Sequence, residues 1–446
     1  MLKTEQQIKA PLKKVLGVVF GISIVVGSTI GAGIFRVPAS IAALLPDKLL
    51  ILACWLVTGL YILLCASSYA ELTTMLPKAG GSFNYVKRAF GNYVGFAAGW
   101  FDFILNVGAP AFFCIVLGEY TILLFPQFAG FSKQVGIGYL TVFTLLNLPG
   151  IKMSSATQKI TSILKVLLLL ALVAGCFLAK PQQHVATLIP AATVFNGTLV
   201  IAFFKAMQLI LSTYDGWMAV SFFAEEDENP GKNIPRSYFI GAATVIALYL
   251  LINGAIMYVL PLDDIAHSPL AASAAAAVAF GSWSSFVIEV IAVFVVISIL
   301  NAYMLIPSRI LLGLSREGYF IPEAARLNKG GTPYIALLIC YVITIIFITY
   351  NTFEQVFALA AVMLTVVTSC SFASLLMLRK KEPDLPRPYK VWGYPYMTIL
   401  ALTVTLVLFV GFAISDTRSF LIVAALFLLS YPFYRLLNSK KQPAHQ

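Results

Sequence analysis

The chain has 446 residues, of which 60% are hydrophobic and only 11% are charged, and its formal net charge is +11. Soluble domains typically carry about 25% charged residues, whereas the mean hydropathy here is +0.89. The composition excludes an ordinary soluble domain and predicts an all-α polytopic membrane protein.

Apolar stretches long enough to cross a bilayer recur along the whole chain. Each span needs about 20 apolar residues. Twelve spans are expected, at about 15–45, 49–76, 92–125, 133–149, 155–179, 197–226, 237–260, 284–314, 333–350, 354–378, 396–415 and 419–437. We expect one transmembrane domain over 15–437, polar tails at 1–14 and 438–446, and loops at 77–91, 180–196, 261–283, 319–332 and 379–395. The polar start followed by a long apolar stretch does not resemble a cleavable signal peptide.

The basic residues are distributed unevenly between the two sides of these spans. Only Lys48, Lys133, Lys180 and Arg418 fall in the segments opposite the N-terminus, whereas most of the 30 lysines and arginines fall on its side. Positive residues gather on the cytoplasmic side of membrane proteins. The excess therefore predicts that both termini are cytoplasmic, and it does not indicate nucleic-acid binding.

The first span is interrupted at its centre by residues 27–35, GSTIGAGIF. Glycine costs about 1 kcal/mol relative to alanine inside a helix. Unpaired backbone at membrane depth is tolerated only where it is buried in protein or lines a wet cavity. We expect a break here, after which the amides of Gly31, Ala32 and Gly33 begin a half-helix and favour an anion such as a carboxylate.

The sixth span is also interrupted near its centre, by residues 211–217, LSTYDGW. Interrupted segments at matching positions of two halves indicate an inverted-repeat transporter with a midplane site. The last carbonyls of the outer half, from Leu211 to Tyr214, favour a cation such as an ammonium group. The two breaks together predict a site for a zwitterion, namely an α-amino acid. Alternatively, the glycines serve only close helix packing.

These two motifs occur together with EEDENPGKNIPRS at 225–237, and with Ser308-Arg309 and SREG at 315–318 after the eighth span. In this combination the chain resembles the amino acid–polyamine–organocation superfamily, most closely bacterial permeases related to L-type amino acid transporters. The resemblance covers nearly the whole chain. It implies a five-plus-five inverted-repeat fold with repeats at about 15–179 and 197–378, two extra helices at about 396–437, and alternating access.

The chain departs from its relatives at both breaks. Many relatives have serine where this chain has Ala32, so only backbone amides remain to hold a carboxylate there. L-type relatives read FAYGGW where this chain reads STYDGW, so that Ser212 replaces a gating aromatic residue and Asp215 replaces a glycine. The second departure leaves the identity of the substrate open.

Six ionisable residues fall well inside the spans: Arg36, Asp102, Lys165, Lys205, Asp215 and Glu289. A charge at the bilayer centre costs at least about 2.5 kcal/mol, so each is expected to face the interior or water and to have a partner. Lys165 aligns with a lysine that, in resembling permeases, lies beside the first broken helix. It either carries a coupled proton or braces that helix in an exchanger, and a lysine that snorkels to the interface is the alternative.

Asp215 lies within the second break and allows two interpretations. It either adds negative charge that favours cationic amino acids or polyamines, or it pairs with Lys205, Arg36 or Lys165. Tyr214 and Trp217 either form an aromatic lid over the substrate or simply pack.

Other function classes find little support in the sequence. No histidine falls inside a span, so neither a metal site nor a nucleophile–base pair is indicated, and we expect no enzyme activity, no metal and no cofactor. The six cysteines fall within spans, and the segment 126–133 lacks the cysteine that disulfide-linked relatives need for a heavy chain. A channel is disfavoured by the two half-helix breaks, whereas a nutrient sensor on the same scaffold stays open.

The expected function is secondary active transport of amino acids, by proton symport or by exchange. The expected location is the plasma membrane, specifically a bacterial inner membrane. The expected partners are the lipid bilayer and the amino acid, together with protons in the case of symport. The residues expected to bind substrate are Thr29, Ile30, Gly31, Ala32, Gly33, Leu211, Ser212, Thr213, Tyr214 and Asp215, with Lys165 and Trp217 in coupling or gating.

Overall fold

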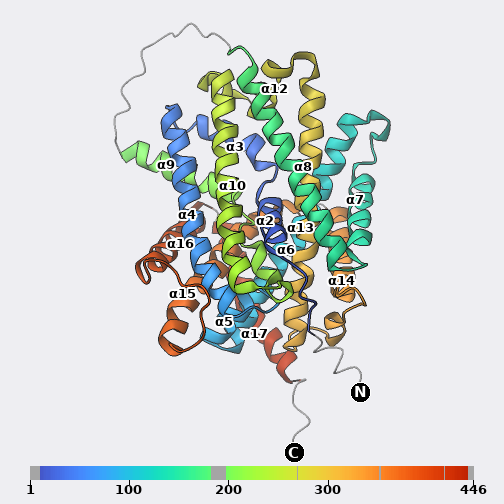
Figure 1. Cartoon of the computed structure of the whole chain (residues 1–446), viewed down its shortest axis with the longest axis vertical. Coiled ribbons are helices and arrows are strands. Elements are labelled where there is room, and N and C mark those ends of the chain that lie inside the picture. Colours follow the sequence, from blue (N-terminus) through green and yellow to red (C-terminus); the bar gives the residue numbers. More distant parts are fainter. Residues whose placement is uncertain (1–10, 182–196, 269, 351–352, 416, 440–446) are drawn as a thin grey trace, which may run out of the picture.

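A computed structural model of the chain describes residues 11–181, 197–268, 270–350, 353–415 and 417–439, and the regular elements in these ranges are helices. Most of the long helices run between two ends of the molecule (Figure 1). We name these ends after helices that lie there: the α12 end, with α12 (Ala271–Phe280), and the α5 end, with α5 (Ser82–Phe90).

The first span consists of two helices, α2 (Val18–Thr29) and α3 (Gly33–Ala42), which meet at an angle of 52°. The helix ends where glycines weaken it, and Ile30 takes an extended conformation between the two halves. The expected break in the first span is therefore confirmed.

The sixth span breaks at the expected motif, but its second half is not an α-helix. Helix α9 (Gly197–Thr213) is followed by a turn and then by η2 (Ala219–Glu226), a 3₁₀-helix of eight residues. Runs of 3₁₀-helix longer than three or four residues are uncommon and often mark a hinge.

The remaining long helices follow the expected spans with small differences at their ends. They are α4 (Lys48–Met75), α6 (Asn92–Leu124), α7 (Ser132–Asn147), α8 (Ile151–Leu178), α10 (Pro230–Val259), α13 (Ser284–Arg316), α14 (Tyr334–Tyr350), α15 (Phe353–Lys381), α16 (Tyr396–Ser415) and α17 (Thr417–Ser439). Among the described residues, seven helices are long and apolar enough to cross a membrane, and the bent pair makes an eighth span. Helices α9, α14 and α16 are apolar but shorter.

Several segments expected to be loops contain helices, which corrects the sequence analysis. Helix α5 lies within 77–91, α11 (Leu262–His267) and α12 lie within 261–283, and η4 (Pro322–Ala325) lies within 319–332. A length criterion for membrane spans does not detect helices of six to ten residues. Residues 182–196 lie outside the described ranges.

Helix α10 begins seven residues before the expected start of the seventh span. Asn-Pro is a common turn signal, but here Asn229 precedes the helix and Pro230 is its first residue. Proline is well suited to that position because its missing N–H group would have no partner there.

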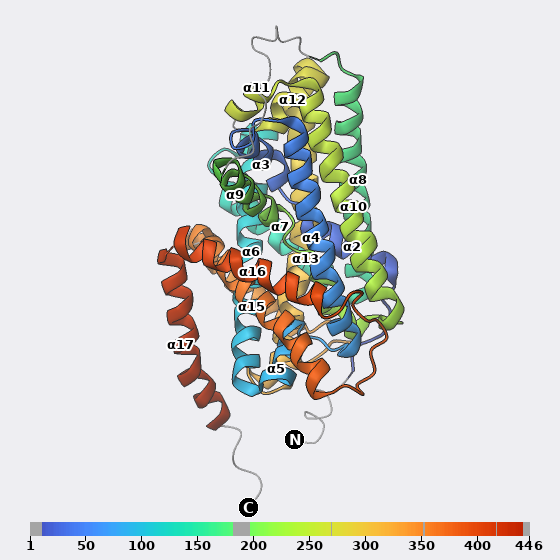
Figure 2. The same cartoon turned by 90° about the vertical axis from the view of Figure 1, so that its left-hand side faces the viewer.

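The first break is enclosed by three neighbouring helices. Helix α2 packs against α8, α10 and α13, and α3 packs against α9. Figure 2 shows α4, α10 and α8 side by side on one flank of the molecule, with α15, α16 and α17 on the other. The breaks thus lie within the helix bundle, surrounded by protein.

Candidate functional site

Groups from two neighbouring helices hold the end of α2. The ammonium group of Lys165, which is fully buried on α8, donates hydrogen bonds to the carbonyl oxygens of Gly27 at 2.8 Å and Ile30 at 2.6 Å. The hydroxyl of Tyr249 on α10 donates to the carbonyl of Thr29 at 3.2 Å. The last carbonyls of a helix lack partners within it, and these side chains supply them.

The second break is in direct contact with the first. The same hydroxyl lies 2.7 Å from the carbonyl oxygen of Thr213, so its single hydrogen is shared between the ends of α2 and α9, with Thr213 as the nearer acceptor. The hydroxyl of Ser28 donates to the carbonyl of Gly216 at 2.8 Å. Gly216 has a φ of +93°, and a Cβ atom there would lie 2.5 Å from the carbonyl oxygen of Ser28. Only glycine fits this position.

The start of α3 also lies against the end of α9. A Cβ atom on Gly33 would lie 2.8 Å from the Cγ2 atom of Thr213. Close packing, proposed above as the alternative role of the glycines, is therefore one of their roles. The amides of the first break and the end of α9 are brought to the same place.

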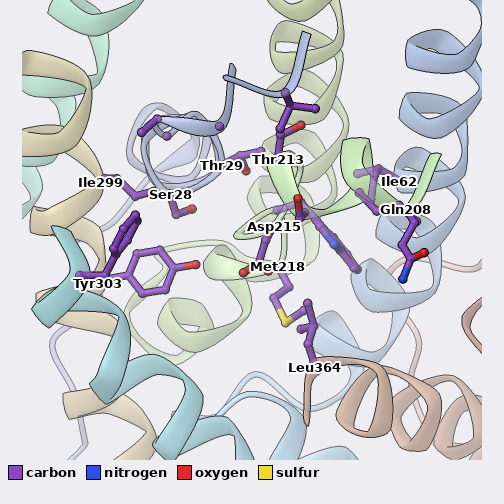
Figure 3. Close-up of a pocket in the computed structure, with 18 of the residues that line it drawn as sticks. Ser28, Thr29, Ile62, Gln208, Thr213, Asp215, Met218, Ile299, Tyr303 and Leu364 are labelled. Carbon is purple, nitrogen blue, oxygen red and sulfur yellow. The ribbon is translucent and has the colours of Figure 1, made fainter. Parts of the chain in front are cut away.

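A cavity of about 380 Å³ opens between the two breaks (Figure 3). Its walls include residues of α4, α6, α13, α15 and α16 as well as both breaks. Nine of the expected site residues line it: Thr29, Gly31, Ala32, Gly33, Leu211, Ser212, Thr213, Asp215 and Trp217. The volume falls in the range of about 300–1,000 Å³ that is usual for small-molecule sites.

Three of the expected residues do not line the cavity. Ile30 is fully buried, and Lys165 meets the end of α2 from α8. Tyr214 is buried among aromatic rings, with centroids 6.1 Å from Trp55 and 4.9 Å from Tyr249. Neighbouring residues of a turn point in different directions, so a contiguous motif cannot place all of its side chains in one cavity.

The cavity also contains polar residues that the sequence analysis missed. Tyr303 of α13 points its hydroxyl into the cavity, and Gln208 of α9 lies on the opposite side (Figure 3). A tyrosine or glutamine in an otherwise apolar span is a signal that could have identified them. Tyr249, which bridges the two breaks, carries the same signal.

Asp215 has different partners from those considered in the sequence analysis. Its Oδ1 atom accepts a hydrogen bond from the amide of Gly216 at 2.8 Å, and Tyr303 lies close enough to act on the carboxyl group electrostatically. In the described ranges no ion pair joins Asp215 to Lys205, Arg36 or Lys165. Lys205 is exposed on α9, and Arg36 lines the cavity.

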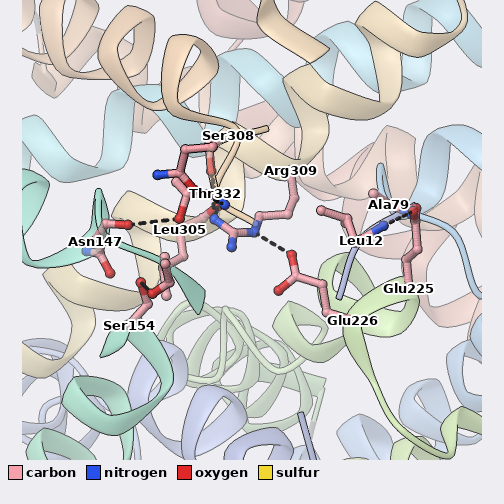
Figure 4. Close-up of polar contacts among 12 residues, drawn as sticks. Leu12, Ala79, Asn147, Ser154, Glu225, Glu226, Leu305, Ser308, Arg309 and Thr332 are labelled. Atoms are coloured by element: carbon pink, nitrogen blue, oxygen red, sulfur yellow. Dashed lines mark hydrogen bonds and ion pairs between the residues drawn. The ribbon is translucent and has the colours of Figure 1, made fainter. Parts of the chain in front are cut away.

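A network of ion pairs and hydrogen bonds joins η2, α13 and the start of the chain (Figure 4). Glu226 and Arg309 are both fully buried and form a pair at 3.1 Å. Glu225 pairs with Arg316 at 2.7 Å and accepts hydrogen bonds from the amides of Leu12 and Ala79. The segment 225–237, one of the motifs that carry the family resemblance, therefore begins with a network that joins η2 to α13 and to the start of the chain.

The described residues show no other reactive centre. They contain no group of three or more histidine, cysteine or acidic side chains that could hold a metal ion. The six cysteines are free thiols, five of them buried.

The chain is similar to known transport proteins over most of its length. A family model described as amino acid permease matches residues 16–431. The chain is 28% identical to the serine/threonine exchanger SteT of Bacillus subtilis (strain 168), over 96% of this chain and 98% of that protein. It is 27% identical to the b(0,+)-type amino acid transporter 1 of Mus musculus, over 94% and 86% of the two chains.

A third relative is the large neutral amino acids transporter small subunit 2 of Mus musculus, which is 29% identical over 85% of this chain and 73% of that protein. These relatives are transporters and exchangers, not enzymes. Since the family model covers most of the sequence, this multi-pass membrane protein belongs to the amino acid permease family.

Proposed function

We propose that the chain is a secondary active amino acid transporter that works by alternating access, with its substrate bound across the two breaks. The observation that carries this proposal is the cavity lined by both breaks. The names of the relatives, an exchanger of serine and threonine and two amino acid transporters, support the substrate class.

The substrate carboxylate binds at the start of α3 in this proposal. The amides of Gly31, Ala32 and Gly33 lie at a helix N-terminus and line the cavity, and such amides favour negative charge. The substrate ammonium binds opposite, where Leu211, Ser212 and the Asp215 carboxylate line the cavity. The carbonyl of Thr213 already accepts from Tyr249, so it contributes less to this pole than the sequence suggested.

Lys165 links occupancy of the site to the shape of the first span. Its ammonium holds the two carbonyls at the end of α2, directly before the amides proposed to bind the carboxylate. A shift of the substrate carboxylate at the amides therefore affects the Lys165 hydrogen bonds at the end of α2, and a shift of Lys165 affects the amides. Both transport modes of the hypothesis, proton symport and exchange, can use this link.

The proposed architecture extends the eight spans found in the described residues to twelve, by including α7, α9, α14 and α16. The repeats are 15–179 and 197–378, the extra helices fall within 396–437, and the tails 1–14 and 438–446 are cytoplasmic. The asymmetry of basic residues supports this orientation, and the bacterial exchanger among the relatives supports a bacterial inner membrane.

Ligand binding and transport test the proposal separately. Purified protein is screened by thermal unfolding against amino acids and polyamines, because a ligand that binds the folded state raises the unfolding temperature. The best ligand is then used in counterflow assays with proteoliposomes. We expect at least one amino acid to be active in both. Binding without counterflow would favour a nutrient sensor, and no binding by any amino acid would refute the proposal.

A second candidate is a carrier of cationic amino acids or polyamines. It is favoured by the Asp215 carboxylate, which lines the cavity without a basic partner in the described residues. This version predicts that Asp215→Asn lowers uptake of lysine or putrescine and spares neutral amino acids. Unchanged uptake of lysine and putrescine would eliminate it.

A further inference from the structure

A buried carboxyl group that the transport proposal does not use lies on α6. Asp102 has no exposed surface. It precedes Phe112, which lines the cavity, by ten residues, or about 15 Å along the helix axis. Helix α6 starts directly after α5, so Asp102 lies on the α5 side of the cavity. The ion pairs of Glu225 and Glu226 lie on the same side.

The surroundings of Asp102 are polar but contain few donors. Tyr69, Ser82 and Tyr85 are as completely buried as Asp102, and the hydroxyls of Tyr69 and Ser82 are 3.5 Å apart. Neither carboxyl oxygen of Asp102 has a hydrogen-bond partner in the described part of the chain. The hydroxyl of Ser82 is near enough to influence the ionisation of the Asp102 carboxyl group, but the two groups do not meet the geometric criteria for a hydrogen bond.

No positive charge faces this carboxyl group within the described residues. The titratable groups that act on it electrostatically are Tyr69 of α4, Tyr85 of α5 and Asp215 of the second break. Five basic residues of the helices around it pair with other acids: Lys87 of α5 with Glu317, Arg88 with Glu382, Arg309 of α13 with Glu226, Arg316 with Glu225, and Arg379 of α15 with Glu71. Lys48 of α4 and Lys381 of α15 donate to the backbone carbonyls of Met257 and Ala89.

These surroundings favour the neutral acid over the carboxylate. An ionised group buried without a partner costs several kcal/mol, and the nearby Asp215 carboxyl disfavours a second negative charge. These surroundings therefore favour a proton on Asp102 in this conformation.

An aromatic contact connects the surroundings of Asp102 with the cavity wall. Trp217 lines the cavity, and its ring meets the ring of Tyr69 edge-on with centroids 4.9 Å apart. At the start of α5, a Cβ atom on Gly81 would run into the ring of Phe222 on η2. The residues around Asp102 thus rest on η2 and Trp217, which both belong to the second broken span. Movement of that span would admit water to them.

We propose that Asp102 is a proton-binding site of the transport cycle, which holds its proton while the α5 end is closed and releases it to water when η2 and Trp217 move. The carboxyl O–H bond breaks, the proton leaves as hydronium, and a hydrated carboxylate remains. After the α5 end has closed, a hydronium ion from the opposite side of the membrane reaches the carboxylate through the cavity and returns a proton to it, so that one proton crosses in each cycle. The proton and the amino acid move in the same direction, so this inference rests on the proposed function.

Proton movement and amino acid exchange are measured in the same proteoliposomes, with a pH-sensitive dye inside. In the wild-type protein, addition of the transported amino acid is expected to acidify the interior. Asp102→Asn, which imitates the neutral acid, is expected to keep counterflow and to lose the acidification. Asp263→Asn, which changes an exposed aspartate of α11, is the matched control and keeps both.

The inference would be overturned if proteoliposomes with Asp102→Asn acidified as much as those with wild-type protein. It would also be overturned if the wild-type protein showed counterflow without any proton movement. Absence of counterflow in wild type for every amino acid would overturn the proposed function as well. If Asp102→Asn does not fold, Asp102→Glu is the second test. It keeps a titratable group, so its acidification is expected to persist with a displaced pH profile, and an unchanged profile would contradict the proposal.

Discussion

The two breaks look alike in the sequence, since each places glycine and hydroxyl side chains inside an apolar span, but they are built differently. The first break is short, lies between two α-helices, and is held by a buried ammonium group on its carbonyls. The second continues as a 3₁₀-helix and relies on Gly216 at a positive φ.

This difference separates the tasks of the two breaks. Lys165 and Tyr249 hold carbonyls of the first break, and its amides are the groups proposed above to bind the carboxylate. At the second break, Tyr249 reaches the carbonyl of Thr213, and Gly216 lies directly against Ser28. A buried charge thus holds the carbonyls of the first break, whereas hydroxyl and backbone groups make these contacts of the second.

The largest effect is expected where the second break cannot tolerate a side chain. Gly216→Ala forces a residue with a Cβ atom to a φ of +93°, against the carbonyl of Ser28. The positive φ alone costs about 1–3 kcal/mol. We expect a clearly lower unfolding temperature and loss of transport. Gly138→Ala on α7, where a Cβ atom meets nothing within 4 Å, should leave both unchanged.

Removal of the ammonium group tests the first break. Lys165→Ala leaves two buried carbonyls without their donor, at a cost of about 1–3 kcal/mol each. We expect counterflow to fall by about ten-fold or more, since 1.4 kcal/mol corresponds to ten-fold. Lys152→Ala, at an exposed position of the same helix, is the control. Counterflow unchanged in Lys165→Ala would remove the role proposed for this residue.

A smaller and reversible effect is expected where the breaks touch. Gly33→Ala brings a methyl group against the Cγ2 atom of Thr213 and should weaken substrate binding. Thr213→Ser removes that methyl group, so the double variant should recover part of the lost affinity in thermal-shift titrations. Gly254→Ala on α10, which has open space, controls for the change itself. Lack of recovery would show that the contact is not the cause.

The smallest effect is expected at the bridge between the breaks. Tyr249→Phe removes the hydroxyl whose single hydrogen is shared between the carbonyls of Thr213 and Thr29, and a hydrogen bond is worth about 0.5–1.5 kcal/mol. We expect a modest fall in unfolding temperature and a fall of a few fold in the counterflow rate. Tyr258→Phe, at an exposed tyrosine on the same helix, should show neither. Equal behaviour of the two variants would mean that the bridge contributes nothing.

Much of the fold could be predicted because membrane spans depend on local composition. The break in the first span follows from the clustered glycines at 27–33, and the break in the sixth from the polar residues at 211–217. The short helices α5, α11 and α12 were missed because they do not span, and the start of α10 was misplaced because proline indicates both turns and helix beginnings.

The site was predicted only in part, because a cavity depends on contacts between distant segments. Motif residues of the two breaks meet there, but Ile30 and Tyr214 point elsewhere. The bridge from Tyr249 to Thr29 joins residues 220 positions apart, and no local pattern indicates it. The partners of Asp215 likewise depend on the turn that follows α9.

The network at the end of η2 has a mechanical consequence. The amides of Val15 and Leu16 both donate to the carbonyl of Glu226, and the amide of Glu228 donates to the carbonyl of Leu16. These three backbone hydrogen bonds connect the segment at residues 15–16 to the end of η2. When η2 moves, the start of the chain must either move with it or lose these hydrogen bonds. A fluorescent probe beside Leu12 would therefore report the motion of η2.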